Sequence, residues 1–234
     1  MIWDLDVHKL MGSNGHRFRL DIAFRSDSRR LVLFGPSGAG KSLTLQAIAG
    51  LLRPDAGHVR LEGQALFDAD RGIDLPPQQR RLAYLFQDYA LFPHLTVRQN
   101  VGFGLAGGWR NPRRHFRHEM VERWLRSFEL EALADRYPDQ LSGGQRQRTA
   151  LARALVSEPR ALLLDEPFAA LDSQLRRRLR AELAELQQRL STPMVLITHD
   201  EADVQAFADE VVCIDAGSAT QAVGNELAAQ AAPA

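Results

Sequence analysis

One segment near the N-terminus constrains the fold more than any other feature of this chain. Residues 35–42 read Gly-Pro-Ser-Gly-Ala-Gly-Lys-Ser, which is the pattern of a phosphate-binding loop. The loop follows the apolar run 31–34 and precedes a predicted helix from Lys41 to about Gly50. A loop between a buried strand and a helix start points backbone N–H groups and the positive end of the helix dipole at an anion. The segment therefore predicts an α/β core with a phosphate site at a strand-to-helix junction.

The side chains of this loop indicate a nucleoside triphosphate bound with magnesium. We expect Lys41 to bridge the β- and γ-phosphates and the Ser42 hydroxyl to ligate Mg²⁺. A glycine-rich turn without a ligand would not explain the Lys-Ser pair at a helix start. The residues expected to contact the nucleotide here are Gly35, Pro36, Ser37, Gly38, Ala39, Gly40, Lys41 and Ser42.

A buried run later in the chain ends in two adjacent carboxylates. Residues 162–166 read Leu-Leu-Leu-Asp-Glu, and an acidic pair at a strand end is costly unless something binds it. Next to the phosphate loop, Asp165 is expected to ligate Mg²⁺. Glu166 is then the candidate general base for the water that attacks the γ-phosphate.

The apolar pattern predicts a mostly parallel central sheet. Continuous apolar runs at 31–34, 161–164 and 194–197 are typical of parallel strands buried on both faces, and helical patterns follow them. Residues 2–7 and 18–24 instead alternate, as strands with one exposed face do.

The middle of the chain predicts a helical subdomain set into this core. From Gln87 to about Asp139, prolines and glycines interrupt the regular pattern, and residues 115–128 read as a helix. We expect residues of about 1–86 and 159–234 to form the α/β core with its N-terminal β part, and about 87–158 to form the helical part.

Composition excludes several classes of protein. Lys and Arg number 29, as do Asp and Glu, so there is no global basic field of the kind that attracts nucleic acid. The single cysteine, Cys213, cannot form an intrachain disulfide. No apolar stretch approaches the roughly 20 residues that span a bilayer, so any membrane crossing is expected to belong to other chains.

A second anion-binding pattern distinguishes this chain from other nucleotide triphosphatases. Residues 141–148 read Leu-Ser-Gly-Gly-Gln-Arg-Gln-Arg and lead into an Ala-rich helical run at 149–156. A serine hydroxyl and glycine amides at a helix start form an anion cradle. An ordinary helix cap would explain Ser142 but not the glycine pair. The residues expected to contact nucleotide here are Ser142, Gly143, Gly144 and Gln145.

Residues 141–145 match the signature of ATP-binding-cassette (ABC) ATPases, which the chain resembles along nearly its whole length. The resemblance implies an α/β fold with a P-loop NTPase core, an antiparallel β subdomain and an inserted helical subdomain. It also implies three roles. Gln87 would reach Mg²⁺ and the attacking water, Asp172 would lie in a loop that crosses a dimer interface, and His199 would contact the γ-phosphate. Catalysis would then rest on Lys41, Glu166, His199 and Gln87.

The same resemblance implies partners. Two copies would associate head to tail with ATP and Mg²⁺, so that each ATP lies between the phosphate loop of one copy and Ser142 to Gly144 of the other. A transmembrane permease would be driven from the cytoplasmic face of the inner membrane, with an external solute-binding protein acting through it. No C-terminal regulatory domain and no nucleic-acid partner are expected.

Three positions depart from the family pattern. Leu43 replaces a second hydroxyl, with an expected loss of about 1 kcal/mol in nucleotide contact. Ala169 replaces a common serine in the interface loop. An aromatic residue at the usual position for stacking on adenine is missing, and His16 or Phe18 is the candidate substitute.

Within the family, residues 90–101 resemble bacterial importers for oxyanions, maltose, polyamines or ferric ion, and residues 72–81 are most similar to molybdate importers. An exporter ATPase would commonly be fused to membrane helices. A soluble cassette of DNA repair or translation would carry a coiled coil or a second cassette. A regulator without turnover would lack Glu166 or His199. The solute itself stays open at this stage.

Overall fold

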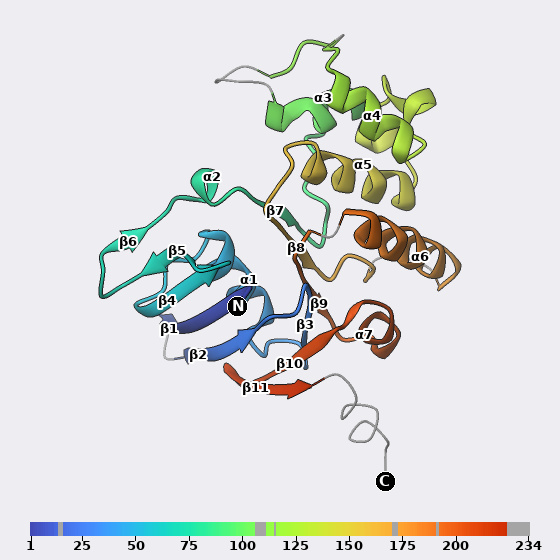
Figure 1. The fold of residues 1–234 in the computed structure, drawn as a ribbon. Coiled ribbons are helices and arrows are strands. Elements are labelled where there is room, and N and C mark those ends of the chain that lie inside the picture. Colours follow the sequence, from blue (N-terminus) through green and yellow to red (C-terminus); the bar gives the residue numbers. More distant parts are fainter. Residues whose placement is uncertain (14–15, 106–110, 115, 170–172, 191, 224–234) are drawn as a thin grey trace.

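The structure is a computed structural model, and it describes residues 1–13, 16–105, 111–114, 116–169, 173–190 and 192–223 (Figure 1). The described strands form one 11-stranded sheet in the order β6-β5-β4-β1-β2-β11-β10-β3-β9-β8-β7. The strands are β1 (Trp3–Ser13), β2 (His16–Ser26), β3 (Arg30–Phe34), β4 (Ala56–Leu61), β5 (Gln64–Asp68), β6 (Ile73–Asp74), β7 (Leu82–Leu85), β8 (Ala161–Asp165), β9 (Met194–Thr198), β10 (Glu210–Asp215) and β11 (Ser218–Val223).

The sheet has a parallel part and an antiparallel part. Strands β7, β8, β9, β3 and β10 pair in parallel, whereas β1 pairs antiparallel with β2 and β4, and β4 and β5 continue that pattern. All five residues of β8 and of β9 are buried, as their continuous apolar runs predict. The mixed α/β fold expected from the sequence is thereby confirmed.

Successive side chains of the parallel strands enter two separate cores. On β3, Val32 packs in one hydrophobic cluster with residues of β7, β8 and the later helices. Leu31 and Leu33 pack in the other, which contains β1, β2 and α1 (Lys41–Ala49). Because side chains alternate across a strand, a short apolar run supplies both cores at once.

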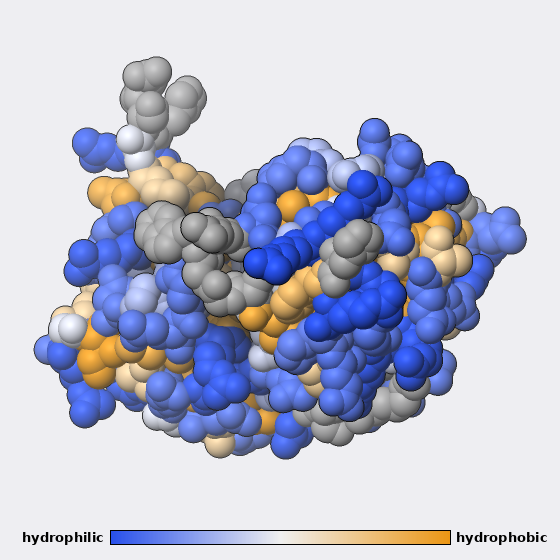
Figure 2. Space-filling model, turned by 90° about the horizontal axis from the view of Figure 1, so that it is seen from above, coloured by the Kyte–Doolittle hydropathy of each residue, from blue (hydrophilic) through white to orange (hydrophobic). Residues whose placement is uncertain are grey.

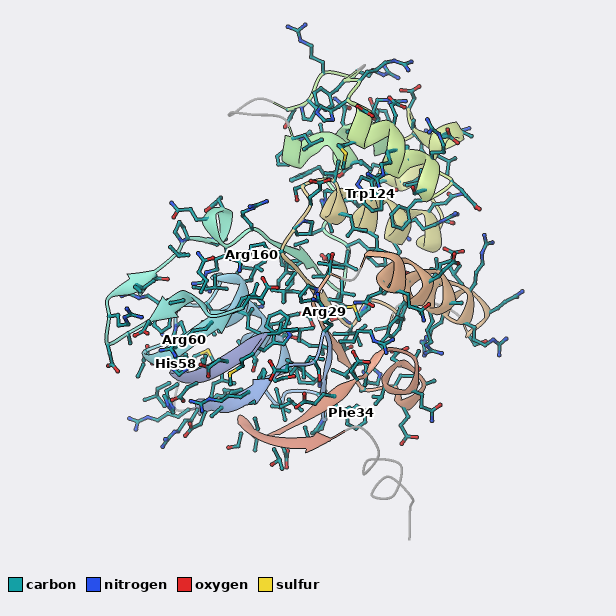
Figure 3. The ribbon with its side chains drawn as sticks, viewed as in Figure 1. Arg29, Phe34, His58, Arg60, Trp124 and Arg160 are labelled. Atoms are coloured by element: carbon teal, nitrogen blue, oxygen red, sulfur yellow. The ribbon has the colours of Figure 1, made fainter. Side chains whose placement is uncertain are left out.

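The remaining helices lie on the side of the first core. They are α3 (Val97–Gly102), η1 (Phe103–Leu105), α4 (Glu119–Ser127), η2 (Glu131–Leu133), η3 (Pro138–Gln140), α5 (Gly143–Leu155), α6 (Ser173–Leu190) and α7 (Glu201–Phe207). The exception is the short helix α2 (Pro77–Arg80), which lies next to the β4–β6 strands. Figure 1 shows α3, α4 and α5 stacked at the end of the molecule farthest from β11. Trp124, labelled in Figure 3, lies in their interior and is buried.

One predicted helix start was wrong, because a side chain caps that helix at a later residue. The helix predicted at 115–128 begins at Glu119, because His118 has extended backbone angles and its Nδ1 accepts the N–H of Met120; His115 lies outside the described residues. The helix start predicted at Ser142 to Gly144 is confirmed, because α5 begins at Gly143 and Ser142 caps it. Local hydrogen bonds at the cap, rather than apolar periodicity, set where each helix begins.

Surface polarity is mixed: Figure 2 shows the face seen from above, where hydrophobic residues form patches between hydrophilic ones. Within the described residues, none of the helices is long and apolar enough to cross a membrane. Arg160, labelled in Figure 3, precedes β8 and donates to Glu62 in the turn between β4 and β5. This contact ties the antiparallel part of the sheet to the parallel part.

Candidate functional site

The phosphate loop joins β3 to α1 with a backbone that only glycine accommodates at two positions. At Gly35, a Cβ would lie 2.0 Å from the carbonyl oxygen of Ile214 on β10. At Gly40, φ is 107°, and a Cβ would lie 2.8 Å from a methyl of Leu20. Gly40 is the N-cap of α1 and has no side chain, so no N-cap side chain accepts a hydrogen bond from the first N–H groups of the helix. The loop thus presents a helix start suited to an anion.

Lys41 lies over this loop, where it is buried. Its Nζ donates to the carbonyl oxygens of Gly35 and Pro36, at 2.7 and 2.8 Å. Burial lowers the pKa of Lys41, and the carboxylates of Glu166 and Asp165 oppose that change. The ammonium group therefore lies among the loop carbonyls and two carboxylates, from which it can turn to a phosphate oxygen.

Asp165 is the centre of a small oxygen-rich cluster. The Ser42 hydroxyl donates to Oδ1 of Asp165 at 2.9 Å, and the Tyr84 hydroxyl donates to Oδ2 at 2.9 Å. Burial raises the pKa of Asp165, while the bonds from Tyr84 and Ser42 oppose the rise. Burial and the charge of Asp165 also hold the pKa of Tyr84 well above its usual range, so its hydroxyl stays a donor.

The donor set of this cluster fits Mg²⁺. A hydroxyl and a carboxylate from adjacent elements are the hard oxygen ligands that Mg²⁺ takes in small number, with water and phosphate oxygens completing its shell. Among the described residues, no group of three or more His, Cys, Asp or Glu side chains could hold a metal by itself. A metal held jointly with phosphate oxygens is therefore the arrangement that these residues suit.

Glu166 and His199 come together at the ends of β8 and β9. His199 Nδ1 lies 3.4 Å from Oε1 of Glu166. Glu166 has a φ of 45°, and its N–H donates to the carbonyl of Ile197 at 3.1 Å. A left-handed backbone at a non-glycine residue is a conformation that tertiary contacts must hold in place. The side chain of His199 is 62% exposed and that of Glu166 is 20% exposed, so both can meet a ligand.

A network that sequence analysis missed holds the loop of His199 against α6. Arg180 donates to Oδ1 of Asp203 at 2.7 Å, and Thr198 donates to Oδ2 of Asp203 at 2.6 Å. Arg180 also reaches Asp200, whose N–H donates to the Thr198 hydroxyl. Only the order of β9, α6 and α7 in space brings these groups together, because in the sequence the Arg looks like one of several on a solvated helix face.

Gln87 lies just past β7 and is exposed. Two residues later, Tyr89 and Ala90 have φ values of 64° and 42°. Arg153 of α5 donates to the carbonyl oxygens of both residues at 2.7 Å. The segment that follows Gln87 is thereby bonded to the helix that begins at Ser142.

The second glycine-containing segment starts α5. The Ser142 hydroxyl accepts the N–H of Gln145 at 3.3 Å, and the Gln145 side chain accepts the N–H of Ser142 at 2.9 Å. Gly144 is buried, and a Cβ there would lie 2.9 Å from a methyl of Leu175 on α6. Figure 1 shows α5 and α1 in separate parts of the molecule. The two glycine segments therefore lie apart from each other within one chain.

Two of the residues singled out as departures from the family pattern, Phe18 and Leu43, lie near the phosphate loop and α1. Phe18 lies against the end of the loop, with its ring 3.3 Å from the position of a Cβ on Gly40. Leu43 is half-buried and packs against the core around α1. The side chain of His16 lies outside the described residues, and so does Asp172.

Comparison with known proteins gives matches to a family model, to related sequences and to a solved structure. A family model described as "ABC transporter" matches residues 19–169. A "probable sulfate/thiosulfate import ATP-binding protein" of Chlorella vulgaris is 44% identical over 92% of this chain and 88% of its own length. A spermidine/putrescine import ATP-binding protein of Nitratidesulfovibrio vulgaris is 47% identical over 82% of this chain, and a molybdenum import ATP-binding protein of Paramagnetospirillum magneticum is 40% identical over 92%.

The lengths of these relatives differ from that of this chain. The match covers 50% of the spermidine/putrescine protein and 57% of the molybdenum protein, so the chain spans about half of each. A solved dimeric ATP-binding cassette in a post-hydrolysis state, bound to ADP and Pi, aligns with a TM-score of 0.78 at 27% identity, over 96% of this chain and 99% of that one.

Proposed function

This chain belongs to the ABC transporter family, and we propose that it is the ATP-binding and ATP-hydrolysing subunit of an importer for an oxyanion such as molybdate. One observation carries the ATPase part of the proposal. The hydroxyl of Ser42, the carboxylate of Asp165 and the pair formed by Glu166 and His199 lie around one phosphate loop. Positioning and charge neutralisation are what phosphoryl transfer requires of a protein.

Each residue of this cluster has a role in that chemistry. When bound, MgATP supplies the γ-phosphoryl group and a divalent charge on its oxygens. Lys41 would exchange the loop carbonyls for a phosphate oxygen, and Ser42 and Asp165 would hold the metal. Oε1 of Glu166 takes the proton of the attacking water, and His199, 3.4 Å from that atom, orients the carboxylate and contacts the phosphate. Gln87, just past β7, would contribute its side-chain amide to the same water and metal.

The proposal includes a head-to-tail homodimer. Ser142, Gly143, Gly144 and Gln145 would close the nucleotide site of the second copy, and Asp172 would lie between the two sites. In support, the start of α5 and the phosphate loop lie apart within one chain, and a structural neighbour is a dimeric cassette bound to ADP and Pi. Residues of about 1–86 and 159–234 would form the ATPase core, and about 87–158 the helical part.

A groove next to Gln87 supports a permease partner. It has a volume of about 430 Å³ and is lined by apolar groups that include Phe86 and Phe103, which are 37% and 38% exposed. Arg153, which bonds the segment after Gln87, lies in the same groove. A permease segment bound in this groove would contact Phe86 and Ala90, which lie on either side of Gln87 in the sequence. The chain would then act as a peripheral subunit on the cytoplasmic face of the membrane, with an external solute-binding protein acting through the permease.

The oxyanion assignment rests on resemblance. Two of the relatives above are named for sulfate/thiosulfate and for molybdenum, and the segment 72–81 is similar to molybdate importers. The structure gives that segment a packing role as well, because Arg80 is fully buried and donates to Ala47 and Ile48 at the end of α1. Polyamine import is the second candidate, because a spermidine/putrescine relative matches at 47% identity.

Two experiments test the proposal. The chain is purified from membranes together with its co-expressed neighbours, and a permease is expected to copurify. Phe86→Asp should release the permease, whereas Leu10→Asp, at an exposed leucine outside the groove, should not. Uptake by the reconstituted complex should favour molybdate or sulfate over maltose and spermidine. Uptake of spermidine alone would replace the oxyanion assignment, and the absence of any permease would overturn the transport function.

A further inference from the structure

Tyr84 connects the metal-binding cluster to the groove. Its hydroxyl donates to Oδ2 of Asp165 at 2.9 Å, on the carboxylate whose Oδ1 accepts the Ser42 hydroxyl. Its ring lies 4.4 Å, centroid to centroid, from the ring of Phe86. Tyr84 and Phe86 both line the groove described above.

The pairing of β7 with β8 explains how a residue of the edge strand reaches Asp165. Tyr84 lies opposite Leu163 in the parallel register, and Asp165 is two residues further along β8, on the same face. The hydroxyl of a long side chain spans that offset. Tyr84 is thus half-buried: its hydroxyl lies in the cluster, while its ring packs against the core around α1 and lines the groove.

A carboxylate that ligates a metal is oriented by the hydrogen bonds that it accepts, and losing such a partner typically weakens metal binding about 10- to 100-fold. The bond from Tyr84 occupies Oδ2 and thereby directs Oδ1 toward Ser42. Movement of the Tyr84 ring would rotate the carboxylate. The ring packs against the core around α1 and against Phe86, and any occupant of the groove would contact Phe86.

We propose that Tyr84 is a positioning residue for Asp165 and that its packing against Phe86 couples occupation of the groove to metal binding. The inference rests on the proposed function, because it takes Asp165 as the Mg²⁺ ligand and the groove as the seat of the permease. It adds a physical route by which a partner in the groove acts on the metal without touching it.

The test measures the affinity for Mn²⁺, used as a paramagnetic substitute for Mg²⁺, in the presence of a non-hydrolysable ATP analogue. Tyr84→Phe keeps the ring and removes the hydroxyl, so Mn²⁺ should bind about 10-fold more weakly or worse, while binding of the analogue without metal is unchanged. The matched control is Tyr89→Phe, which removes another buried tyrosine hydroxyl, one that has no hydrogen-bond partner in the structure. Wild-type Mn²⁺ affinity in Tyr84→Phe would overturn the positioning role.

A second pair of variants tests the link to the groove. Phe86→Ala should weaken Mn²⁺ binding several-fold, because the Tyr84 ring loses the aromatic contact on its groove side. Phe103→Ala removes a groove aromatic that packs on Phe92 instead, and should leave Mn²⁺ affinity unchanged. Equal effects of the two variants, or none from Phe86→Ala, would overturn the coupling.

Asp165→Asn separates failure of this inference from failure of the proposed site. Weakened Mn²⁺ binding in Asp165→Asn together with normal binding in Tyr84→Phe would leave the metal site standing and refute the role of Tyr84. Normal Mn²⁺ binding in Asp165→Asn would refute the metal site itself, and the inference with it.

Discussion

The two glycine-containing helix starts of this chain differ in what surrounds them. At the start of α1, Gly40 provides no side-chain cap, and Lys41, Asp165 and Glu166 lie close by. At the start of α5, Ser142 and Gln145 form a reciprocal cap, and Ser142 is exposed. The start of α1 therefore leaves its backbone N–H groups available to a ligand, and charged side chains lie beside them. The second satisfies two donors internally.

This difference indicates which start can act alone. The α1 start has its cation, the proposed metal ligands and the proposed base within the same chain. The α5 start has an exposed hydroxyl and the N–H groups of a first helical turn, which can contact an anion but cannot activate a water. A start of the second kind becomes useful when another copy brings the phosphates to it.

The largest expected effect comes from combining lesions at the two starts. Homodimers of Lys41→Ala and of Ser142→Arg should both be nearly inactive, because each damages both composite sites. A mixed dimer places both lesions in one site and leaves the other intact, so it should occlude one ATP. The measurement is nucleotide occlusion by the purified mixed dimer beside both homodimers. A confirmed mixed dimer without recovery would place both starts in the same site of one chain.

The next effect isolates the chemistry next to α1. Glu166→Gln keeps the shape of the side chain but removes the base, so ATP hydrolysis should slow by at least about 10²-fold while ATP still binds. Turnover and nucleotide binding are measured on the same preparation. Glu201→Gln, at an exposed glutamate that begins α7, serves as the control and should hydrolyse ATP at the wild-type rate. Similar rates for the two variants would remove Glu166 from this role.

A smaller effect tests the cap. Ser142→Ala removes the acceptor for the N–H of Gln145, and the free energy of unfolding should fall by about 1 kcal/mol. Ser37→Ala, at an exposed serine of the phosphate loop, should change the free energy of unfolding by less than about 0.5 kcal/mol. Urea unfolding of the nucleotide-free chains measures both. Equal losses would mean that the two starts are not distinguished by capping.

The smallest effect concerns the buried carboxylate near α1. Without metal, burial raises the pKa of Asp165, so the folded protein holds that proton more tightly than the unfolded chain does. Stability from this group is present at pH values below its ordinary pKa and is lost as pH rises through the raised pKa. Asp165→Asn should therefore have a higher Tm than wild type at neutral pH in chelator, and the gap should narrow in acid. Asp139→Asn, at an exposed carboxylate just before α5, should have the same Tm as wild type at both pH values.

Much of the site was accessible from motifs, whereas its supporting contacts were not. The strand-loop-helix order around Lys41 and the buried run before Asp165 predicted the main elements, and both form as expected. Tyr84 escaped notice because it reads as an ordinary strand residue until β7 is known to pair with β8. Arg180 and Arg80 likewise look like solvated arginines, yet one bonds the loop of His199 and the other is fully buried.

The sequence by itself determined the family, the phosphate loop and the buried strands, because each depends on residues that are neighbours in the chain: glycines, a Lys-Ser pair and continuous apolar runs. Only the tertiary structure decided the partners of Asp165, the contact of Glu166 with His199 and the place of the groove next to Gln87. These depend on the order β3-β9-β8-β7, in which strands far apart in the sequence become neighbours. Hydrogen bonds and ring contacts act over a few ångströms, so spacing along the chain cannot reveal them until that order is known.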